Sequence, residues 1–485
     1  MNDPVCDAII IGAGFSGMAM AIELQMRGVD AFRILEKAGE VGGTWRENTY
    51  PGAECDIASA LYSYSFEHNA GWEYKWSGQQ QIHDYQRGVA DKYGIYEKTD
   101  FGQEVISAQF DDEQSVWRIR TAQGEIYCCR FLISAVGQLH IPHMPRIDGQ
   151  AGFCGEQFHS AKWRHDIDLV GKRVAVIGNA ASALQFIPEI APQVAQLTVF
   201  QRSANWVVPK MDRPYSAFEQ KISARFPWLT RLYRFRIWLR NECVLLPAMR
   251  RNRLARWALQ RMALRELRTH IADPELRKIL TPDYPIGAKR MLVSDNYYPA
   301  LARENVRLQT SLIEKITSSG IACRDGSSED FDIIIYGTGF QTNPFLAGID
   351  VSGAAGKRLN EHWQEGAHAY LGVVTHGFPN FFMLYGPNTN LGHNSILIMS
   401  EAQARYIAQT IIGIKRRGVR QLEVKPEVES VYNRKLQEKL AQMAFSEVKQ
   451  SWYMDGGRVT NNWAGSTLAY RQLLKRVAWD DFVVN

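Results

Sequence analysis

The chain has few features of a membrane-spanning or disulfide-bonded protein. Its 485 residues contain no run of 18 or more apolar residues without charge, which predicts that no helix spans a membrane. The seven cysteines are odd in number and irregularly spaced, with no CxxC pair and no Cys/His cluster. We therefore expect reduced thiols, no metal site and a cytoplasmic setting.

Targeting and nucleic-acid-binding signals are also absent from the sequence. The first apolar strand begins within a few residues of Met1, so we expect no signal or transit peptide. No recognisable nucleic-acid-binding module is visible, which predicts no nucleic-acid partner. A hydrophobic content of 46% and a charged content of 22% are typical of a globular protein, and the length predicts two or three domains.

Positive charge is concentrated in one stretch of the chain. Residues 221–271 contain thirteen Lys or Arg and two acids, a net charge of +11, whereas the whole chain carries +5. Aromatic and aliphatic residues alternate with these arginines at helical spacing. Three interpretations stay open: a solvated helical face, attraction of a phosphorylated cofactor, and weak peripheral contact with an anionic membrane surface.

The first forty residues have the order of a dinucleotide-binding unit. An apolar strand runs into a glycine-rich turn, followed by a helical pattern and a second strand that ends in Glu36. The turn reads Gly12, Ala13, Gly14, Phe15, Ser16 and Gly17. In such a unit Gly12 makes the turn, Gly14 admits a pyrophosphate and Gly17 lets helix and strand touch. The helix N-terminus is expected to hold the phosphates, and Glu36 the ribose hydroxyls.

A second unit of the same kind follows the apolar run at 174–177. Its turn reads Gly178, Asn179, Ala180, Ala181, Ser182 and Ala183. Alanine thus stands at the second glycine position, and the Ala180 methyl group would crowd a pyrophosphate unless the loop has adjusted to it. After the next strand, Arg202 and Ser203 stand where an NAD enzyme carries an acid. These side chains can hold a ribose 2′-phosphate, which favours NADPH over NADH.

The stretch that follows the first unit resembles a known family. Thr44 and Trp45 lead through a Pro-Gly turn to Asp56 and Tyr62. This run resembles the FAD-binding segment of class B flavoprotein monooxygenases, the group that contains the Baeyer–Villiger and flavin-containing monooxygenases. The resemblance implies that Trp45 and Asp56 lie beside the isoalloxazine ring and that Thr44, Tyr62 and Val105 also contact FAD.

A fingerprint before the second unit narrows the resemblance. Residues 153–163 fit the pattern FxGxxxHxxxW, which is associated with Baeyer–Villiger monooxygenases and their closest relatives. Arg164 follows, where the family has Pro or Asp. The resemblance implies that Gly155, His159 and Trp163 couple domain movement to cofactor binding, and that His159 is not an acid–base catalyst.

A Lys-Arg pair is the predicted catalytic feature. Such a pair on a loop is ordinarily a surface feature, but in Baeyer–Villiger-type sequences its arginine stabilises the flavin peroxide and the anionic intermediate. The resemblance therefore implies that Arg290 is catalytic together with Asp56, and that Lys289 helps to hold the nicotinamide cofactor. The remaining expected cofactor contacts are Thr338 and Gly339, which follow Gly337 in a turn where the family has alanine, and Asn388.

The resemblance spans nearly the whole chain and implies an α/β fold with two Rossmann-like domains. Residues 1–145 and 328–485 are expected to form the FAD-binding domain. Residues 150–325 are expected to form the NADP-binding domain, with a helical insertion over about 212–285. Pro142, Pro145 and Gly149 mark the linker between them.

The implied activity is an NADPH-dependent oxygenation. NADPH reduces FAD, O2 then gives a C4a-peroxyflavin, and attack on a carbonyl substrate converts a ketone into an ester or lactone. Oxygen transfer to the nitrogen of an amine or the sulfur of a sulfide is the alternative, and a catalytically silent nucleotide-binding protein is a third interpretation. A pyridine-nucleotide disulfide reductase is disfavoured, because Trp45 stands where its paired cysteines would be expected.

Overall fold

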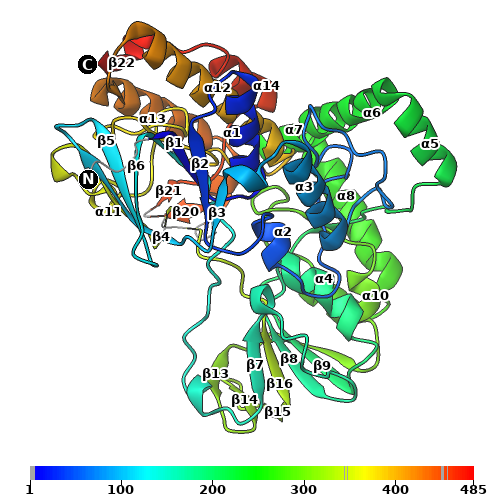
Figure 1. Ribbon diagram of the computed structural model, residues 1–485. Helices are drawn as coiled ribbons and strands as arrows, with labels where there is room; N and C mark the ends of the chain where they lie inside the picture. Colours follow the sequence, from blue (N-terminus) through cyan, green and yellow to red (C-terminus); the bar gives the residue numbers. More distant parts are fainter. Residues whose placement is uncertain (1–5, 343–344, 347, 449–452, 456) are drawn as a thin grey trace.

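The computed structural model of the protein describes residues 6–342, 345–346, 348–448, 453–455 and 457–485 (Figure 1). It contains two large sheets, each covered by helices, and a group of helices beside them. None of the helices in these ranges is both long enough and apolar enough to cross a membrane. The mixed α/β fold with parallel strands at the centre of each large sheet agrees with the predicted fold class.

The first sheet is built from both ends of the chain. Its parallel part contains β1 (Cys6–Ile11), β2 (Phe32–Glu36), β3 (Thr99–Phe101), β6 (Ile126–Ser134) and β18 (Phe381–Met383). An antiparallel extension adds β4 (Val105–Asp111) and β5 (Val116–Thr121), and β17 (Asp350–Ser352) pairs with β4. The centre of β1 is fully buried because both faces of the sheet are covered, which explains its unbroken apolar sequence.

Helices from distant parts of the chain cover this sheet. Figure 1 shows α1 (Phe15–Met26) beside α12 (Ile396–Arg417), and the two share one hydrophobic core with β1 and β2. The other helices of this domain are α2 (Thr44–Glu47), α3 (Gln79–Lys92), α11 (Leu359–His362), α13 (Pro426–Leu440) and α14 (Thr467–Leu473). Two short antiparallel pairs complete it, β19 (Leu422–Val424) with β22 (Phe482–Val484) and β20 (Met454–Asp455) with β21 (Arg458–Val459).

The second sheet is entirely parallel. Its order is β12 (Val306–Gln309), β9 (Gln196–Phe200), β8 (Arg173–Ile177), β16 (Ile333–Tyr336) and β7 (Glu156–His159), with α4 (Ala181–Ile190) and α10 (Tyr297–Leu301) packed on it. An antiparallel sheet of β13 (Ile313–Ile316), β14 (Gly320–Cys323) and β15 (Ser328–Asp330) follows β12. The chain leaves this domain after Tyr336, later than the expected end at 325, because β16 pairs with both β7 and β8 inside the sheet.

A helical insertion, which the sequence predicted over about 212–285, follows β10 (Val207–Val208). It contains α5 (Ala217–Arg225), α6 (Pro227–Arg240), a π-helical turn (Asn241–Leu245), α7 (Leu246–Met249), α8 (Arg253–His270) and α9 (Pro274–Ile279). The strands β10 and β11 (Leu292–Val293) pair where the chain enters and leaves it. Helix α6 packs Ile237 on Ala58, Ala60 and Leu61, so the insertion lies directly on the loop that carries Asp56 and Tyr62.

Two linkers run side by side between the sheets. The His143 N–H donates to Gly339 O at 2.8 Å, and the Gln341 N–H donates to Ile141 O at 2.9 Å. The Thr338 hydroxyl donates to His143 O at 2.5 Å. The predicted linker at 142–149 therefore pairs with the segment that carries the predicted Thr338 and Gly339 contacts.

Candidate active site between the two nucleotide units

The first glycine turn requires two of its three glycines for steric reasons. Gly12 has φ +102°, and a Cβ there would lie 2.9 Å from Ala135 O. A Cβ on Gly17 would lie 1.9 Å from Gly12 O, so no side chain fits between helix and strand. Gly14 is less confined, with Gly43 Cα at 3.7 Å as its nearest neighbour. No side chain caps α1 at Gly14, so the N–H groups of its first turn can bind a pyrophosphate.

Glu36 is held against this turn. Its Oε2 accepts from the Ala13 N–H at 2.8 Å, and its Oε1 accepts from the Ala38 N–H at 3.0 Å and from Arg46 Nη1 at 3.2 Å. The carboxylate is thus fixed at the end of β2 beside the glycine turn. Phe15 packs edge-on against Tyr62, and the Ser16 hydroxyl lies 3.0 Å from that of Ser400 on α12. The contacts of Phe15 and Ser16 with a cofactor stay a prediction.

The second glycine turn has the backbone angles of the first at its first and third residues, with different side chains. Gly178 has φ +106°, and a Cβ there would lie 2.4 Å from Gly337 O. Ala180 caps α4 with φ −82° and ψ −166°, and no side chain caps this helix either. Asn179 Nδ2 donates to Ser203 O at 3.0 Å and to Gln201 Oε1 at 2.7 Å, which joins the turn to the segment after β9. Ser182 and Ala183 continue the first turn of α4.

Two cations lie near each other beside the second turn. Lys289 Nζ lies 4.3 Å from the centre of the Tyr284 ring. Burial lowers the pKa of Lys289; Asp283 opposes this effect, and the positive charge of Arg202 adds to it. Because like charges repel, this pair of cations favours an anionic ligand such as a phosphate.

Arg290 and Asp56 meet where the insertion and the first domain join. Arg290 Nη2 lies 2.8 Å from Asp56 Oδ2. Asp56 raises the pKa of Arg290 above its already high value, so the guanidinium stays charged. Its side chain remains 35% exposed, which leaves room for a ligand beside the ion pair. The sequence predicted both residues, and the fold brings them into direct contact.

An aromatic wall stands beside this ion pair. Trp45 Nε1 donates to Tyr62 OH at 3.0 Å, and the two rings meet edge to face. Burial raises the pKa of Tyr62 well above its usual value, so its hydroxyl stays protonated. Thr44 begins the helix that carries Trp45. The predicted FAD residues of this segment thus form a rigid apolar surface of the kind that a flat ring needs.

The three predicted coupling residues lie in the second domain near the linkers. A Cβ on Gly155 would lie 2.4 Å from Asp332 O, so glycine is required there. His159 Nδ1 accepts from the Ala161 N–H at 3.1 Å, and its ring packs on Phe340 in the linker. Burial lowers the pKa of His159 to about 4, so the ring is neutral near pH 7. Trp163 packs against Phe186 of α4.

Asn388 and Val105, both predicted to contact a cofactor, also make structural contacts within the first domain. Asn388 Nδ2 donates to Val459 O at 2.7 Å and to Asn462 O at 3.2 Å, which joins two loops of the first domain. The Val105 side chain is buried in the core of β4 and β5, so only its backbone can face a cofactor.

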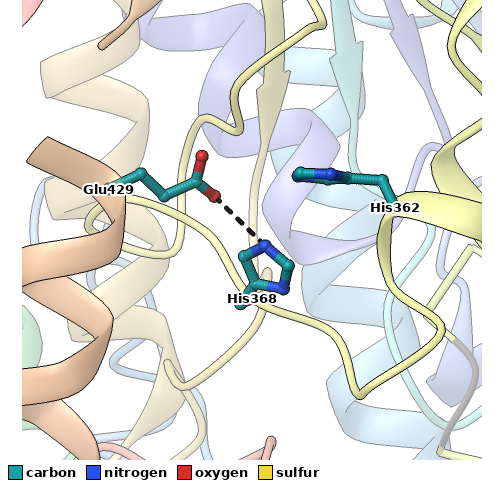
Figure 2. Close-up of side chains that lie close together, drawn as sticks. All are labelled: His362, His368 and Glu429. Atoms are coloured by element: carbon teal, nitrogen blue, oxygen red, sulfur yellow. Dashed lines mark ion pairs between the residues drawn. The ribbon is translucent and has the colours of Figure 1, made fainter. Parts of the chain in front are cut away.

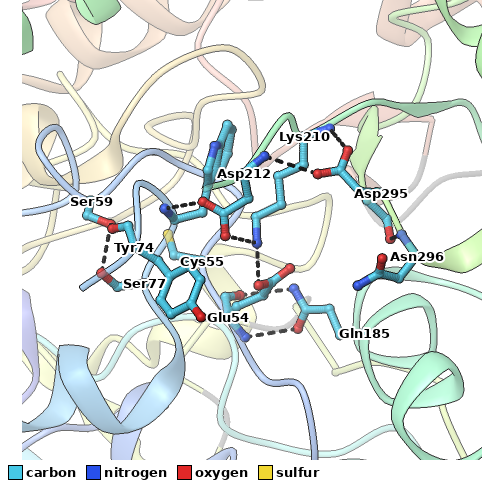
Figure 3. Close-up of polar contacts among 12 residues, drawn as sticks. Glu54, Cys55, Ser59, Tyr74, Ser77, Gln185, Lys210, Asp212, Asp295 and Asn296 are labelled. Carbon is cyan, nitrogen blue, oxygen red and sulfur yellow. Dashed lines mark hydrogen bonds and ion pairs between the residues drawn. The ribbon is translucent and has the colours of Figure 1, made fainter. Parts of the chain in front are cut away.

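A polar network that the sequence did not predict joins the two domains (Figure 3). Gln185 of α4 accepts from Tyr50 OH at 2.9 Å, and its Nε2 donates to Glu54 O at 2.9 Å. Glu54 also forms an ion pair with Lys210, whose side chain is only 5% exposed. Asp295 accepts from the Lys210 N–H at 2.8 Å. The sequence signal that could have indicated this network is Lys210 itself, a single lysine that follows the apolar Val207 and Val208.

Tyr385 is a second unpredicted site residue. Its φ is +56° and that of Asn388 is +58°, conformations that non-glycine residues rarely adopt and that cluster at functional sites. The Tyr385 hydroxyl donates to Asn390 Oδ1 at 2.7 Å. Tyr385 and Tyr453 are both close enough to raise the pKa of Arg290 further, which places them beside the ion pair.

The residues present fit two dinucleotides. Each domain offers an uncapped helix N-terminus behind a glycine turn, the first with an acid at the next strand and the second with two nearby cations.

Comparison with known proteins also indicates a protein with two dinucleotide-binding turns. The family described as pyridine nucleotide-disulphide oxidoreductase matches residues 9–227, which include both glycine turns. All seven cysteines lie in the described ranges, and none of them forms a disulfide there. A Baeyer-Villiger monooxygenase of Pseudomonas aeruginosa is 44% identical over 475 residues, covering 97% of this chain and 90% of that protein.

Solved structures match over the full length. A cyclohexanone monooxygenase from Rhodococcus sp. Phi1 bound to NADP+ has a TM-score of 0.90 at 28% identity, covering 100% of both chains. The protein OTEMO in complex with FAD and NADP has a TM-score of 0.88 at 29% identity, also over 100% of both chains. Since the fold, both nucleotide turns and a relative of nearly equal length agree, this chain belongs to the Baeyer–Villiger monooxygenase family.

Proposed function

We propose that this enzyme uses NADPH and O2 to convert a ketone into an ester or lactone. In the overall reaction one oxygen atom enters the substrate and the other leaves as water, while NADPH is oxidised to NADP+. The observation that carries the proposal is the contact between Arg290 and Asp56 beside the aromatic wall. The relatives named above support the reaction class.

Each nucleotide turn is assigned one cofactor. FAD would be held by the first turn and its acid, with residues Gly12, Gly14, Phe15, Ser16, Gly17, Glu36, Thr44, Trp45, Asp56, Tyr62, Val105, Thr338, Gly339 and Asn388. NADPH would be held by the second, with residues Gly178, Asn179, Ala180, Ser182, Ala183, Arg202, Ser203, Lys289 and Arg290. When bound, FAD accepts a hydride from NADPH and activates O2, and this bond-making chemistry is the cofactor's own.

The protein supplies charge, orientation and exclusion of water. Arg290 offers a fixed guanidinium that offsets negative charge as it develops on the substrate oxygen. Asp56 acts as its positioning partner, because the ion pair fixes the direction of the guanidinium. Trp45 and Tyr62 close one side of the site to water. The neutral His159, together with Gly155 and Trp163, would transmit movement of the second domain to the linkers.

The test is Arg290→Ala. The variant should keep its FAD and still consume NADPH, because hydride transfer needs little new anionic stabilisation. Its ester product should fall by about 10²–10³ relative to NADPH consumed, with hydrogen peroxide released instead. NADPH loss is measured by absorbance and product by mass spectrometry over ketones, amines and sulfides. An unchanged ratio of product to NADPH would contradict the assignment, and oxygenation of amines or sulfides alone would favour the heteroatom alternative.

The proposal includes a weak peripheral contact with an anionic membrane through the insertion. Four apolar residues of α6, spaced by four, three and four residues, are 42–59% exposed: Trp228, Leu232, Phe235 and Leu239. They share one helical face, and Figure 1 shows α5 and α6 projecting away from both large sheets. The net charge of +11 over residues 221–271 favours an anionic lipid surface over a second copy of this chain, which would bring like charges together.

Vesicle binding tests this contact. The wild type should sediment with vesicles of mixed phosphatidylglycerol and phosphatidylcholine, and salt should weaken the binding. The double variant Trp228→Ala/Phe235→Ala should bind less, whereas Ile126→Ala, which removes an exposed apolar side chain of β6, should bind normally. Equal sedimentation of all three proteins, or none, would contradict the proposal. We place the enzyme in the cytoplasm, where its seven cysteines, none of which forms a disulfide in the described ranges, would stay reduced.

A further inference from the structure

Three side chains with no role in the site above converge from separate segments of the first domain. His362 ends α11, His368 lies in the following loop, and Glu429 lies in the first turn of α13. Figure 2 shows the two imidazoles and the carboxylate gathered around one point. One potential metal-ligating atom of each residue lies within 4.8 Å of the other two.

Glu429 is a buried acid that forms no ion pair with a Lys or Arg among the described residues, although Lys357 lies near enough to lower its pKa against the stronger effect of burial, which raises it. Its carboxylate accepts from the Thr375 hydroxyl at 2.8 Å and from the His376 N–H at 2.7 Å, both neutral donors. Its one ion-pair neighbour in the described ranges is His368, with Nε2 at 3.9 Å from Oε1, too long for a hydrogen bond. Buried carboxylates are normally paired with a cation or bound to a metal, because removing their charge from water is costly.

Hydrogen bonds orient both imidazoles for metal binding. His368 Nδ1 lies 3.1 Å from Gly366 O, which can only accept, so Nδ1 carries the proton and Nε2 presents a lone pair to Glu429. The Thr375 hydroxyl gives its hydrogen to Glu429 and therefore accepts from His362 Nε2, at 3.1 Å. Such outer hydrogen bonds are the usual means of fixing metal-binding histidines. The lone pair of His368 Nε2 thus faces the Glu429 carboxylate with no proton between them, and His362 keeps its lone pair on Nδ1.

We propose that His362, His368 and Glu429 bind a divalent zinc ion, with water as the fourth ligand. Two imidazoles and one carboxylate are a zinc-type ligand set, and both histidines are only half buried, which lets water reach the ion. Ligands of a tetrahedral site with normal zinc distances lie roughly 3.3 Å apart, so each side chain needs to move inward by about 1 Å or less. The ion would join α11, its following loop and α13. The sequence predicted no metal site, since these residues follow no ligand-spacing motif.

Metal titration of the untagged, FAD-loaded enzyme tests this proposal. After chelator treatment and dialysis, the wild type should bind one equivalent of Zn²⁺ by calorimetry. Saturating Zn²⁺ should raise the Tm by about 2–5 °C, because the ion binds the folded state. Co²⁺ in its place should give visible bands of tetrahedral cobalt at wavelengths longer than those of oxidised flavin.

Two ligand variants and one control make the result specific. Glu429→Gln keeps an oxygen acceptor for Thr375 but removes the charge, and His368→Ala removes one nitrogen; both should lose the zinc equivalent and the cobalt bands. His270→Ala should behave as wild type, since it breaks a His–Glu pair on α8 for which the described part of the chain offers no third ligand. Retained FAD absorbance shows that each variant is folded. Absence of zinc binding in the wild type, or equal binding in all four proteins, would overturn the proposal.

Discussion

The two nucleotide turns have nearly equal backbone angles at the first and second positions of the glycine pattern, but they differ in side chains and in the approach of helix to strand. Gly12 and Gly178 have φ of +102° and +106°, and the second positions, Gly14 and Ala180, have φ of −81° and −82°. Ala180 therefore needs no special conformation, and its methyl group changes the space before the helix without changing the path of the chain. The positive φ at the first position is thus a requirement of the turn itself, whereas a glycine at the second position is a requirement of a bound phosphate.

Where helix and strand touch, the side with the methyl group differs between the two turns. In the first turn the helix contributes Gly17 and the strand end contributes Ala135, whereas in the second the helix contributes Ala183 and the strand end contributes Gly337. A Cβ on Gly17 would lie 3.5 Å from Ala135 Cβ, and a Cβ on Gly337 would lie 3.0 Å from Ala183 Cβ. In the second turn two methyl groups would be tight at 3.0 Å, which fits the glycine at 337 beside Ala183, whereas in the first turn Gly12 O, not Ala135, excludes a side chain at Gly17.

The largest expected effect is that of Gly17→Ala. Its Cβ would lie 1.9 Å from Gly12 O, a backbone atom that cannot move aside cheaply. We expect a loss of stability beyond the roughly 1–3 kcal/mol of ordinary overpacking, together with loss of bound FAD. Thermal unfolding and flavin absorbance measure both. Gly88→Ala in α3 is the matched control, since nothing lies within 4 Å of its Cβ position. Normal FAD content in Gly17→Ala would show that the first turn tolerates a methyl group as the second does.

Arg202→Ala should have the next largest effect, confined to the second turn. If the guanidinium holds the 2′-phosphate, the KM for NADPH should rise about tenfold or more, because a charge-assisted contact is lost. The KM for NADH should stay nearly unchanged. Arg324→Ala, an exposed arginine of the same domain, should alter neither value. Equal changes for both nucleotides would assign Arg202 another role.

Gly337→Ala should be moderately destabilising. The added methyl group meets Ala183 Cβ at 3.0 Å, and we expect a cost of about 1–2 kcal/mol in the free energy of unfolding. Ala183→Gly alone should cost up to about 1 kcal/mol, since glycine weakens a helix. The double variant, which copies the arrangement of the first turn, should cost less than the sum. Strict additivity in urea unfolding would mean that the two methyl positions do not compete.

Ala180→Gly should have the smallest effect, a modest decrease in the KM for NADPH. The backbone at 180 already matches that at Gly14, so the substitution removes bulk without rearranging the turn. Gly14→Ala is the mirror experiment and should weaken FAD binding. Because its methyl group meets only Gly43 Cα at an ordinary 3.7 Å, the protein itself has room for it, and the effect would come from crowding of the cofactor. An unchanged KM in Ala180→Gly would mean that the cofactor lies clear of residue 180.

Local sequence determined the two nucleotide turns. Gly12, Gly17 and Gly178 are required by contacts or angles within a short strand–turn–helix segment, so their spacing together with the flanking strand and helix patterns identifies the unit. The Arg290 role came from resemblance to a family, because an isolated Lys-Arg pair has no local physical signature. The domain end at Tyr336 was not predictable from composition, since β16 is assigned to its sheet by pairing with β7 and β8.

Tertiary structure alone decided the contacts between segments. Asp56 meets Arg290, Gln185 meets Glu54, and His368 faces Glu429, each pair joined across many residues of intervening chain. No short-range propensity encodes such contacts, because they depend on how the domains, the insertion and the loops pack together. The sequence therefore determined which cofactor-binding units this protein contains, and only packing decided which charged side chains lie beside them.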